Sequence, residues 1–531
     1  MSDERPPLSI VERRNLQPAA GWRAQRIAGP SDLYGANGIQ FGPDGKLYVA
    51  QAFGAQVSSI DLATGQISHV LSGGPLIAPD DLDFDPNGIA YVTDVATATT
   101  WTWRPGEEPI AHATDQPANN GVTVGDDGRI FIDEFRPGGR LLELAPEQGM
   151  PPRTILEGLD GPNALDVGQD GRVYFPQVFA GEVWSLDPDS GETRRISAGL
   201  GSPTAVKVSA SGDLIVPLSA EGVIVQIDPR SGALTTLAEV DPGIDNVALD
   251  ADGRLFVTHY VDGQVSEVPT GTAAGRPPRV LNPPGFVGPF DVAERPGGVL
   301  VVADGLSLAY LEGSTVSRFG RLLTADSPGL IGALHIADDG RTFVAGSNTV
   351  SRYTPAGPRQ IRGDFRNATG VALDASDALL VADHDTGIVH RLHVDSGEGT
   401  ALTESIRHPT RIAVATNDEV YISDDEAGAI YVQHEGMTDL FAKDLVHPQG
   451  IAVDDTRVFV VDAGSNELLA FGRANGEREV LVSQLPLGAG TAGTRLVRAA
   501  GLTQARDGAL IVAADGDGSL IRVTSVRTSS G

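Results

Sequence analysis

A segment of about forty residues recurs along the whole chain, and this repeat constrains the fold more than any other feature. Each copy begins with a short apolar strand, turns at a polar tip and continues as a second β-rich strand, as in "ANGIQFGPDGKLYVA" and "IDNVALDADGRLFVT". The second or third residues of the twelve copies lie at positions 37, 80, 120, 163, 204, 245, 290, 332, 369, 410, 449 and 500. Such a period indicates that every copy folds as one supersecondary unit.

Several of the polar tips contain Asp-Gly, which supplies the positive φ angle of a tight hairpin turn. We therefore expect turns at Asp44-Gly45, Asp127-Gly128, Asp170-Gly171 and Asp252-Gly253. A third and a fourth strand follow the hairpin, for example "QVSSIDL" and "QISHVL". Four strands in one such period are typical of a β-propeller blade, and no helical periodicity of useful length competes. The sequence predicts an all-β protein built from four-stranded antiparallel sheets.

Twelve blades exceed the four to eight that one ring usually holds. Two six-bladed β-propellers in tandem are the simplest division of the 531 residues. We expect the first propeller to span residues 20–275 and the second to span residues 276–531. If each ring lends its first strand to its last blade, "WRAQRIAG" closes the first ring and "PPRVL" closes the second.

Composition excludes several classes of partner. Lysine and arginine number 39 against 70 aspartates and glutamates, which gives a net charge of −31. A surface this acidic repels phosphate backbones and anionic lipids, so we expect a small-molecule substrate and neither nucleic acid nor membrane as a partner. The chain has no cysteine, no apolar run of membrane-spanning length and no apolar stretch in "MSDERPPLSIVERRN". These features favour a cytoplasmic location.

Polar residues gather at the start of the first strands in one half of the chain only. Because the first strands of a propeller lie side by side around its axis, these residues converge although they are distant in sequence. In the first half they are Asn37, Asp80, Asn120, Asn163, Thr204 and Asp245, and in the second half they are Phe290, Gly332, Thr369, Thr410, Gln449 and Ala500.

Amide and carboxylate oxygens are the ligands that a hard divalent cation prefers. Taken singly, each asparagine or aspartate also fits a turn cap. As a set, they predict one bound metal ion, calcium in the first place and magnesium or another divalent cation as alternatives. The expected ligands are Asn37, Asp80, Asn120, Asn163 and Asp245.

With these residues in place, the first half resembles the six-bladed calcium propellers of the gluconolactonase/regucalcin family, diisopropylfluorophosphatase and paraoxonase. The sequences around Asn37 and Asp245 match the "NG" and "DN" strand starts of that family. "PDDLDFDPNGIAYVT" is similar to its acidic strand start, with Asp80 where the family usually has glutamate. The resemblance implies a calcium ion at the floor of the channel; Thr204 and the lack of glutamate depart from the pattern.

The second half resembles NHL-type propellers. Strand ends such as "VADG", "VADHD" and "ISDD" carry structural aspartates in those proteins. His408 and His447 each precede a proline at a strand start, which favours a role in turns over metal ligation.

Candidate catalytic residues end the second strands of the first half. The residues at this place are Gln51, Asp94, Glu134, Gln177, Leu218 and His259. We predict that His259 is a general base for a metal-polarised water or ester carbonyl, with Glu134 and Asp94 as acid/base partners. The alternative for His259 is a structural hydrogen bond to a neighbouring strand.

Three functions agree with these features. The first is a calcium-dependent hydrolase of a lactone or related ester, in which the cation stabilises the oxyanion. The second is a lyase that uses the same cation and a base to remove a proton beside a carbonyl group. Streptogramin lyases, which resemble the second half, support this alternative. The third is a propeller that binds a ligand without catalysis.

Overall fold

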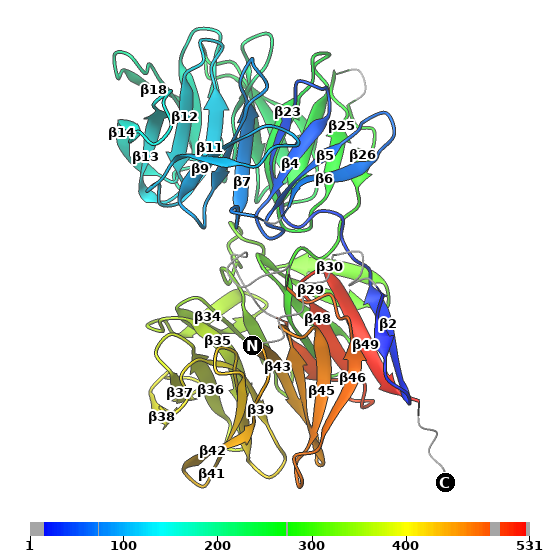
Figure 1. Ribbon diagram of the computed structural model, residues 1–531. Helices are drawn as coiled ribbons and strands as arrows, with labels where there is room; N and C mark the ends of the chain where they lie inside the picture. Colours follow the sequence, from blue (N-terminus) through cyan, green and yellow to red (C-terminus); the bar gives the residue numbers. More distant parts are fainter. Residues whose placement is uncertain (1–14, 73, 272–273, 489–499, 527–531) are drawn as a thin grey trace. The chain divides into compact units, whose positions relative to one another are not determined.

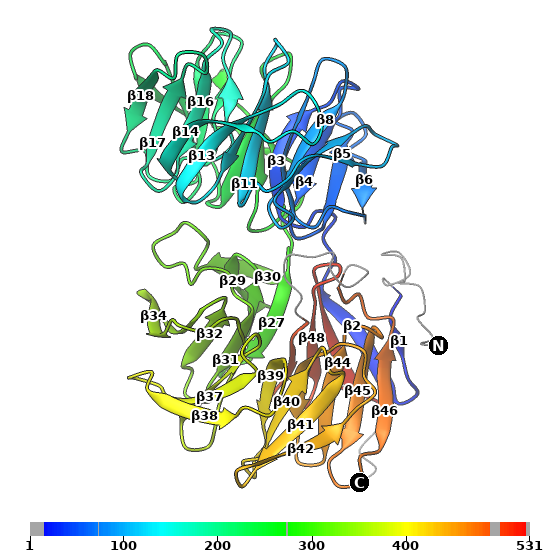
Figure 2. The ribbon, with the colours of Figure 1, turned by 60° about the vertical axis from the view of Figure 1, so that its left-hand side comes forward.

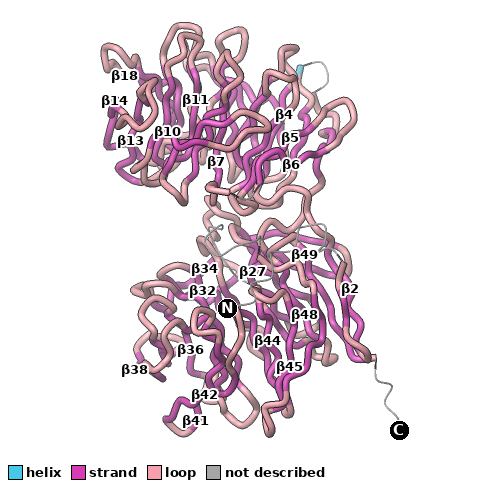
Figure 3. The backbone as a smooth tube through the Cα atoms, viewed as in Figure 1, coloured by secondary structure: helices cyan, strands magenta, loops and turns pink. Residues whose placement is uncertain are grey.

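The computed structural model describes residues 15–72, 74–271, 274–488 and 500–526 (Figure 1). Within these ranges the strands form eleven four-stranded sheets and one five-stranded sheet, all with antiparallel neighbours (Figure 3). No helix in the described ranges is long enough and apolar enough to cross a membrane. The prediction of an all-β protein made of four-stranded antiparallel sheets is confirmed.

The chain divides into two compact units. The first unit spans Asp32–Gly285, and the second combines the residues up to Ser31 with those from Phe286 onward in the described ranges. In ten of the twelve sheets the strands follow one another along the chain as a meander of hairpins, and the other two sheets, both in the second unit, each add one strand from the start of the chain.

The first unit contains six sheets. Their strands are β3 (Ala36–Phe41), β4 (Leu47–Gln51), β5 (Gln56–Ile60) and β6 (Ile67–Ser72); β7 (Pro79–Phe84), β8 (Ala90–Asp94), β9 (Thr99–Trp103) and β10 (Ile110–Ala113); β11 (Asn119–Val124), β12 (Ile130–Glu134), β13 (Pro137–Leu144) and β14 (Arg153–Asp160); β15 (Asp166–Val167), β16 (Val173–Gln177), β17 (Glu182–Leu186) and β18 (Thr193–Ala198); β19 (Lys207–Val208), β20 (Leu214–Leu218), β21 (Val223–Ile227) and β22 (Leu234–Glu239); and β23 (Ile244–Leu249), β24 (Leu255–His259), β25 (Val265–Val268) and β26 (Arg279–Asn282).

The second unit also contains six sheets. Their strands are β27 (Pro289–Glu294), β28 (Leu300–Asp304), β29 (Ser307–Glu312) and β30 (Thr315–Phe319); β31 (Ala333–Ile336), β32 (Thr342–Gly346), β33 (Thr349–Thr354) and β34 (Gly357–Arg362); β35 (Ala368–Leu373), β36 (Ala378–Asp383), β37 (Ile388–His393) and β38 (Gly399–Thr403); β39 (Pro409–Val414), β40 (Val420–Asp424), β41 (Ala429–His434) and β42 (Met437–Ala442); β43 (Pro448–Val453), β44 (Arg457–Asp462), β45 (Glu467–Gly472), β46 (Arg478–Ser483) and β1 (Gln17–Pro18); and β47 (Leu502–Gln504), β48 (Leu510–Ala514), β49 (Ser519–Ser525) and β2 (Trp22–Ala28).

The first strands of the sheets contact one another in a closed order in each unit. In the first unit the order is β3, β7, β11, β15, β19, β23 and again β3. In the second unit it is β27, β31, β35, β39, β43, β47 and again β27. We call the line around which these strands lie the axis of the unit. Apolar side chains fill the space between neighbouring sheets, as where Val49 and Ile39 of the first sheet pack against Phe256 of the sixth.

Local turn chemistry follows the sequence. Gly45, Gly128, Gly171 and Gly253 all have positive φ angles, between 75° and 81°. The preceding aspartates of three of these pairs accept a hydrogen bond from a main-chain amide two residues on. The four predicted Asp-Gly turns are therefore confirmed.

The predicted closure of the two rings is wrong. β2, which contains most of "WRAQRIAG", pairs antiparallel with β49 at the end of the chain, with Trp22 opposite Ser525 and Ala28 opposite Leu520 (Figure 1). β26, which contains most of "PPRVL", pairs with β25 of the first unit. The boundary therefore lies at residue 285 rather than 275, and residues 15–31 belong with the second half.

Both pairings have a physical reason. β26 follows β25 in the chain, so a short loop brings them together at a low cost in chain entropy. β2 is held at the distant end of the chain by its side chains: Ile27 and Ala28 pack into the apolar cluster of Leu520 and Phe286. Figure 2 shows a second tie, the short strand β1 at the edge of β46.

The chain leaves and re-enters the second unit at one place. The Ser31 amide donates to the Asp517 carbonyl at 2.9 Å. A Cβ atom on Gly518 would lie 2.3 Å from the Phe286 carbonyl oxygen and 3.5 Å from Ser31 Cβ. Glycine is therefore required at position 518, where φ is +71°, because Ser31 and Phe286 approach the main chain so closely there.

A structural carboxylate or amide ends most second strands. In the second unit, aspartates accept hydrogen bonds from main-chain amides 15 to 17 residues earlier; they are Asp304, Asp383, Asp424 and Asp462. These bonds hold the loop that leads into each sheet. The expectation of structural aspartates in "VADG", "VADHD" and "ISDD" is confirmed.

Arg26 tests how the second unit closes. Its Nη2 lies 3.0 Å from Oδ2 of Asp517, whose side chain is 1% exposed. Arg26→Gln leaves a buried carboxylate without its cation, and we expect the free energy of unfolding of the second unit to fall by about 3 kcal/mol. Urea denaturation followed separately for each unit measures this loss.

Arg23→Gln is the matched control, because Arg23 lies on the same strand with an exposed side chain. The control is expected to change stability by less than about 0.5 kcal/mol. Equal stability of the two variants would contradict the closing role of β2.

Candidate functional site

The predicted metal ligands lie at equivalent places around the axis of the first unit. Four are the second residues of first strands, and they are Asn37 in β3, Asp80 in β7, Asn120 in β11 and Asp245 in β23. Asn163 lies in the turn just before β15, after the bridge between Pro162 and Gln177.

Three of the five ligands are brought together. Asn37 Nδ2 donates to Asp80 Oδ1 at 2.9 Å. Asn246 Nδ2 of β23 donates to Asp81 Oδ1 of β7 at 3.3 Å, and the charges of Asp80 and Asp81 both act on Asp245. Thr204, the residue that departs from the acidic pattern, donates its hydroxyl to the main-chain carbonyl of Asp245 at 2.7 Å.

Asn120 and Asn163 make other contacts. Asn163 Oδ1 accepts the amide of Ala164 at 2.8 Å, which is the turn cap that an asparagine here can form. Asn120 offers its main-chain carbonyl to the hydroxyl of Thr93. In the described ranges, neither asparagine has a side-chain hydrogen bond to Asn37, Asp80 or Asp245.

The acidic groups at this level repel one another. Burial raises the pKa of Asp80 to about 7, and the neighbouring charge of Asp81 adds to the effect, while the Asn37 hydrogen bond opposes it. Burial and the charges of Asp80 and Asp81 raise the pKa of Asp245 well above its usual value. No described lysine or arginine forms an ion pair with either group. The site therefore favours a positive charge.

Gly38 explains why asparagine and glycine occur together at the start of β3. A Cβ atom at this position would lie 2.2 Å from Asp81 Oδ1 and 2.5 Å from Asp81 Cα. Any larger residue would push β7 away from β3 and break the alignment of Asn37 with Asp80.

A buried lysine lies one level further along the first strands. Lys207 of β19 is 6% exposed, and Asp166, Asp83 and Asp81 surround it. Burial acts to lower the pKa of Lys207, but these three charges outweigh it and raise the pKa above the usual value. Burial raises the pKa of Asp81 to about 6 although the Lys207 charge acts in the opposite direction.

The residues around Lys207 were not predicted from the sequence, although a signal was present. A β-bulge near the start of β3, β7, β11 and β23 shifts the register of the strand, so the alternation of side chains restarts after it. The side chain three residues after the strand start can therefore again reach the neighbouring sheets. The residues at this place in the first five sheets are all polar: Gln40, Asp83, Thr123, Asp166 and Lys207. They bond across sheets, as where Gln40 Nε2 donates to Asp83 Oδ1 at 2.8 Å and Thr123 Oγ1 donates to Asp166 Oδ1 at 3.2 Å.

Asp133 is a second residue that the sequence did not reveal. It is fully buried at the end of β12. Burial raises the pKa of Asp133 well above its usual value; the Gly121 amide opposes this, and the charges of Asp81 and Asp80 reinforce it. The acidic character of the axis therefore exceeds the sequence prediction.

Two of the three predicted catalytic residues have structural partners. Asp94 accepts hydrogen bonds from the amides of Ile77 and Ala78 at 2.6 and 3.1 Å, as the aspartates of the second unit do. Glu134 pairs with Arg136 and Arg140 at 2.7 and 2.5 Å. Burial acts to raise the pKa of Glu134, but the two arginines outweigh it and hold the pKa below its usual value. Glu134 therefore stays ionised at neutral pH.

His259 lies at the end of β24, opposite Ile244 and thus next to Asp245 in the sheet. Its side chain is 1% exposed. The same place in other sheets of this unit is taken by Gln51 and Asp94, which accept main-chain amides. The main chain of His259 therefore lies next to that of Asp245, at a position with a capping role in other sheets.

The axis of the second unit is different in chemistry. Arg411, buried in β39, donates to the main-chain carbonyls of Phe290 and Gly332 at 3.0 and 2.7 Å, and also to that of Thr369. It thereby joins four first strands at their start. The sequence predicted neutral residues here and missed Arg411, which follows Thr410 directly.

A cavity of about 380 Å³ continues beyond Arg411 along the same axis, lined among others by Asp291, His335 and Arg506. Burial lowers the pKa of His335 to about 4, so the imidazole is neutral at physiological pH.

Comparisons with known proteins give similarities to solved structures only. No protein-family model matches the chain, and no curated protein matches it. A putative gluconolactonase is 17% identical, with 50% of this chain and 99% of that chain covered and a TM-score of 0.39. A gluconolactonase from Xanthomonas campestris is 16% identical over 48% of this chain and 91% of its own, with a TM-score of 0.39. Regucalcin, a calcium-binding protein from Agrobacterium tumefaciens, is 16% identical over 45% of this chain and 85% of its own, with a TM-score of 0.37.

The chain thus resembles gluconolactonase and regucalcin structures over part of its length and at low identity, as the sequence predicted.

Lys207 provides a test of the buried charges at the axis. Lys207→Met leaves Asp81, Asp83 and Asp166 facing one another without a cation, and we expect a loss of about 3–5 kcal/mol in the free energy of unfolding near neutral pH. Carboxylates with a raised folded pKa destabilise the protein above that pKa, so the loss is expected to shrink as the pH falls from about 8 to about 5. Urea denaturation at both pH values measures it.

Lys46→Met is the control, because the Lys46 side chain is 44% exposed and pairs only with Asp44 in the described ranges. It is expected to be neutral at both pH values. A Lys207→Met variant whose stability loss is the same at both pH values would show that the aspartates do not repel one another.

Proposed function

We propose that each unit is a six-bladed β-propeller, and that the first unit is a calcium-dependent hydrolase of a lactone or related ester. The closed order of first-strand contacts supports the first part. The observation that carries the second part is the acidic level at the first axis, where Asp80 and Asp245 repel each other with no basic partner in the described ranges.

The residues at this level fit a calcium ion. Asn37 Oδ1 is buried and has no hydrogen-bond partner in the described ranges, although an amide oxygen is a strong acceptor. Asp80 and Asp245 add carboxylate oxygens, which suit a hard cation. Lys207 already compensates the aspartates one level further along, which leaves the first level for an external cation. We expect Asn37, Asp80 and Asp245 to hold the ion, with Asn120 and Asn163 contributing to the ligand set.

A bound calcium ion would polarise an ester carbonyl and stabilise the negative charge that develops on its oxygen. Asn37 fixes the orientation of the Asp80 carboxylate through its 2.9 Å hydrogen bond. His259, beside Asp245 in the sheet, is the proposed general base that takes a proton from the attacking water. Asp94 and Glu134 hold the surrounding loops through their amide and arginine partners rather than transfer protons.

Removal of calcium tests the metal site. A chelator in excess is expected to lower the melting temperature of the wild type, because an ion that binds only the folded state stabilises it by mass action, by about 2.7 kcal/mol at a hundredfold excess over Kd. Asp245→Asn removes one of the repelling charges and is expected to be more stable than the metal-free wild type, yet insensitive to calcium. Differential scanning calorimetry with and without calcium gives both results.

Asp252→Asn serves as the control for that experiment, since Asp252 lies in an exposed turn of the same sheet. It is expected to keep the calcium response of the wild type. An unchanged melting curve of the wild type in excess chelator, with no metal found by elemental analysis, would refute the metal site.

Turnover tests the proposed base. With a panel of lactones as substrates, His259→Gln is expected to lower kcat by about 10²- to 10⁴-fold, the range for a lost general base, and to leave the calcium response intact. Gln449→Ala and Thr410→Ala at the second axis are expected to keep wild-type turnover.

The mass of the product separates the alternatives, because hydrolysis adds water and elimination does not. Loss of turnover in the second-unit variants with full activity of His259→Gln would place the chemistry in the other unit. A calcium response without turnover on any substrate would favour a binding propeller.

A further inference from the structure

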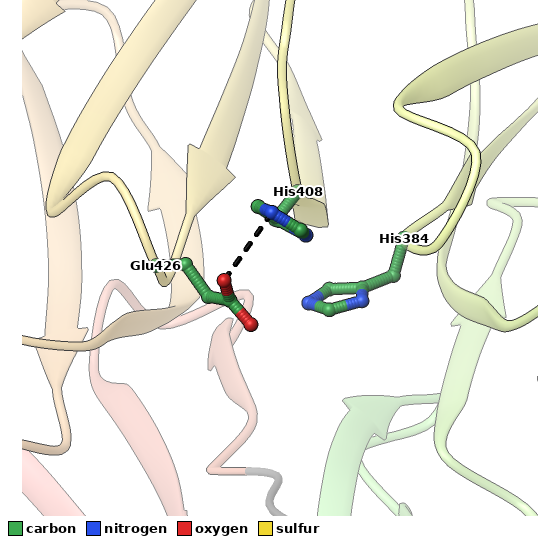
Figure 4. A group of neighbouring side chains, drawn as sticks. All are labelled: His384, His408 and Glu426. Atoms are coloured by element: carbon green, nitrogen blue, oxygen red, sulfur yellow. Dashed lines mark ion pairs between the residues drawn. The ribbon is translucent and has the colours of Figure 1, made fainter.

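Two histidines and a glutamate of the second unit lie close together near the start of its first strands. His384 follows β36, His408 precedes β39 and Glu426 follows β40, so the group comes from two neighbouring sheets. One ligand atom from each of the three side chains lies within 4.8 Å of the other two. Figure 4 shows the three side chains around a common space.

The contacts within the group are short. His408 Nε2 lies 3.2 Å from Glu426 Oε2. The rings of His384 and His408 have centroids 5.0 Å apart at an angle of 47°. His408 Nδ1 is buried and has no hydrogen-bond partner in the described ranges.

The main chain that carries these side chains is fixed. Asp424 accepts the amide of His408 at 3.2 Å, and Asp383 accepts the amide of Asn367, whose carbonyl accepts the amide of His384 at 2.9 Å. The structural aspartates of the second unit therefore position the main chain of both histidines.

The types of ligand select the metal. Imidazole and carboxylate together suit zinc and similar divalent transition metals, whereas calcium takes oxygen ligands only. In a tetrahedral zinc site with bonds near 2.0–2.2 Å, neighbouring ligand atoms are about 3.4 Å apart. A bound zinc ion would therefore require small side-chain movements, because the ligand atoms now lie within 4.8 Å of one another.

Two further carboxylates, those of Asp385 and Asp425, contact the His384 ring. His384 Nδ1 lies 2.7 Å from Asp385 Oδ1, and its Nε2 lies 3.2 Å from Asp425 Oδ1. Metal-binding histidines commonly donate the second ring N–H to a carboxylate, which fixes the ring and makes the free nitrogen more basic. One of these two contacts can serve that purpose while the other nitrogen binds the metal.

We propose that His384, His408 and Glu426 form a site for zinc or a similar divalent transition metal in the second unit. Three protein ligands leave one tetrahedral position for water or an exchangeable ligand. The site is independent of the proposed calcium ion, because it differs in ligand chemistry and belongs to another unit.

Zinc titration of the full-length protein tests this site. The protein is first freed of metal and then saturated with calcium, and zinc binding is measured by competition with a chromophoric chelator. We expect one zinc ion per wild-type chain, and an affinity lower by about tenfold or more in His408→Ala and in Glu426→Gln. Glu426 has a side chain that is 59% exposed, so Glu426→Gln keeps the fold and reports on ligation alone.

His434→Ala is the matched control, because His434 is an exposed histidine of the same unit that lies 3.7 Å from Glu435. It is expected to bind zinc as the wild type does, and so is Asp245→Asn. A wild type that binds no zinc, or equal zinc affinity in the wild type, His408→Ala and Glu426→Gln, would overturn the proposal. Equal zinc affinity in Asp245→Asn, whatever its calcium response, keeps this test separate from that of the first unit.

Discussion

Polar groups from several first strands meet at each axis, and a buried charge or carbonyl there is costly unless an opposite group compensates it. Each unit places a long basic side chain from a first strand at this point. In the first unit Lys207 lies among three aspartates. In the second unit Arg411 donates to the main-chain carbonyls of three other first strands. These two cations compensate polar groups that the closed order of sheets brings together in each unit.

Because Lys207 and Arg411 compensate different groups, the starts of the first strands differ in chemistry between the two units. Arg411 donates hydrogen bonds to the carbonyl oxygens at the start of the first strands of the second unit. These oxygens therefore do not need a bound metal ion. Lys207 compensates aspartates one level beyond the strand starts, whereas burial together with the charges of Asp80 and Asp81 raises the pKa of Asp245. One axis thus holds a buried cation at its start, whereas the other has an excess of oxygen ligands and negative charge there. This difference is the physical basis for proposing the calcium site in the first unit rather than in the second.

Sequence patterns predicted what depends on near neighbours in the chain. The Asp-Gly turns, the four-stranded sheets and the acidic strand starts all follow from local residue types. The closure was mispredicted because two short strands, β2 and β26, fit either sheet edge by pattern; the choice rests on a tertiary contact such as Arg26 with Asp517. Lys207 and His384 were not singled out, and His408 was assigned a role in turns, because only the assembled sheets bring these residues to their partners.

The pairing of β2 with β49 also fixes an order of events in biosynthesis. Arg26 and Asp517, the ion pair between the first and last parts of the second unit, are 491 residues apart. All strands of the first unit leave the ribosome in one continuous run. The first unit can therefore fold before β49, the partner of β2, has been synthesised. In topological terms the first unit is an insertion at the point where Ser31 and Phe286 meet Gly518. The earliest strand made in its sheet is therefore the last to be paired, and a nascent chain cut short before β49 leaves β2 as an open edge.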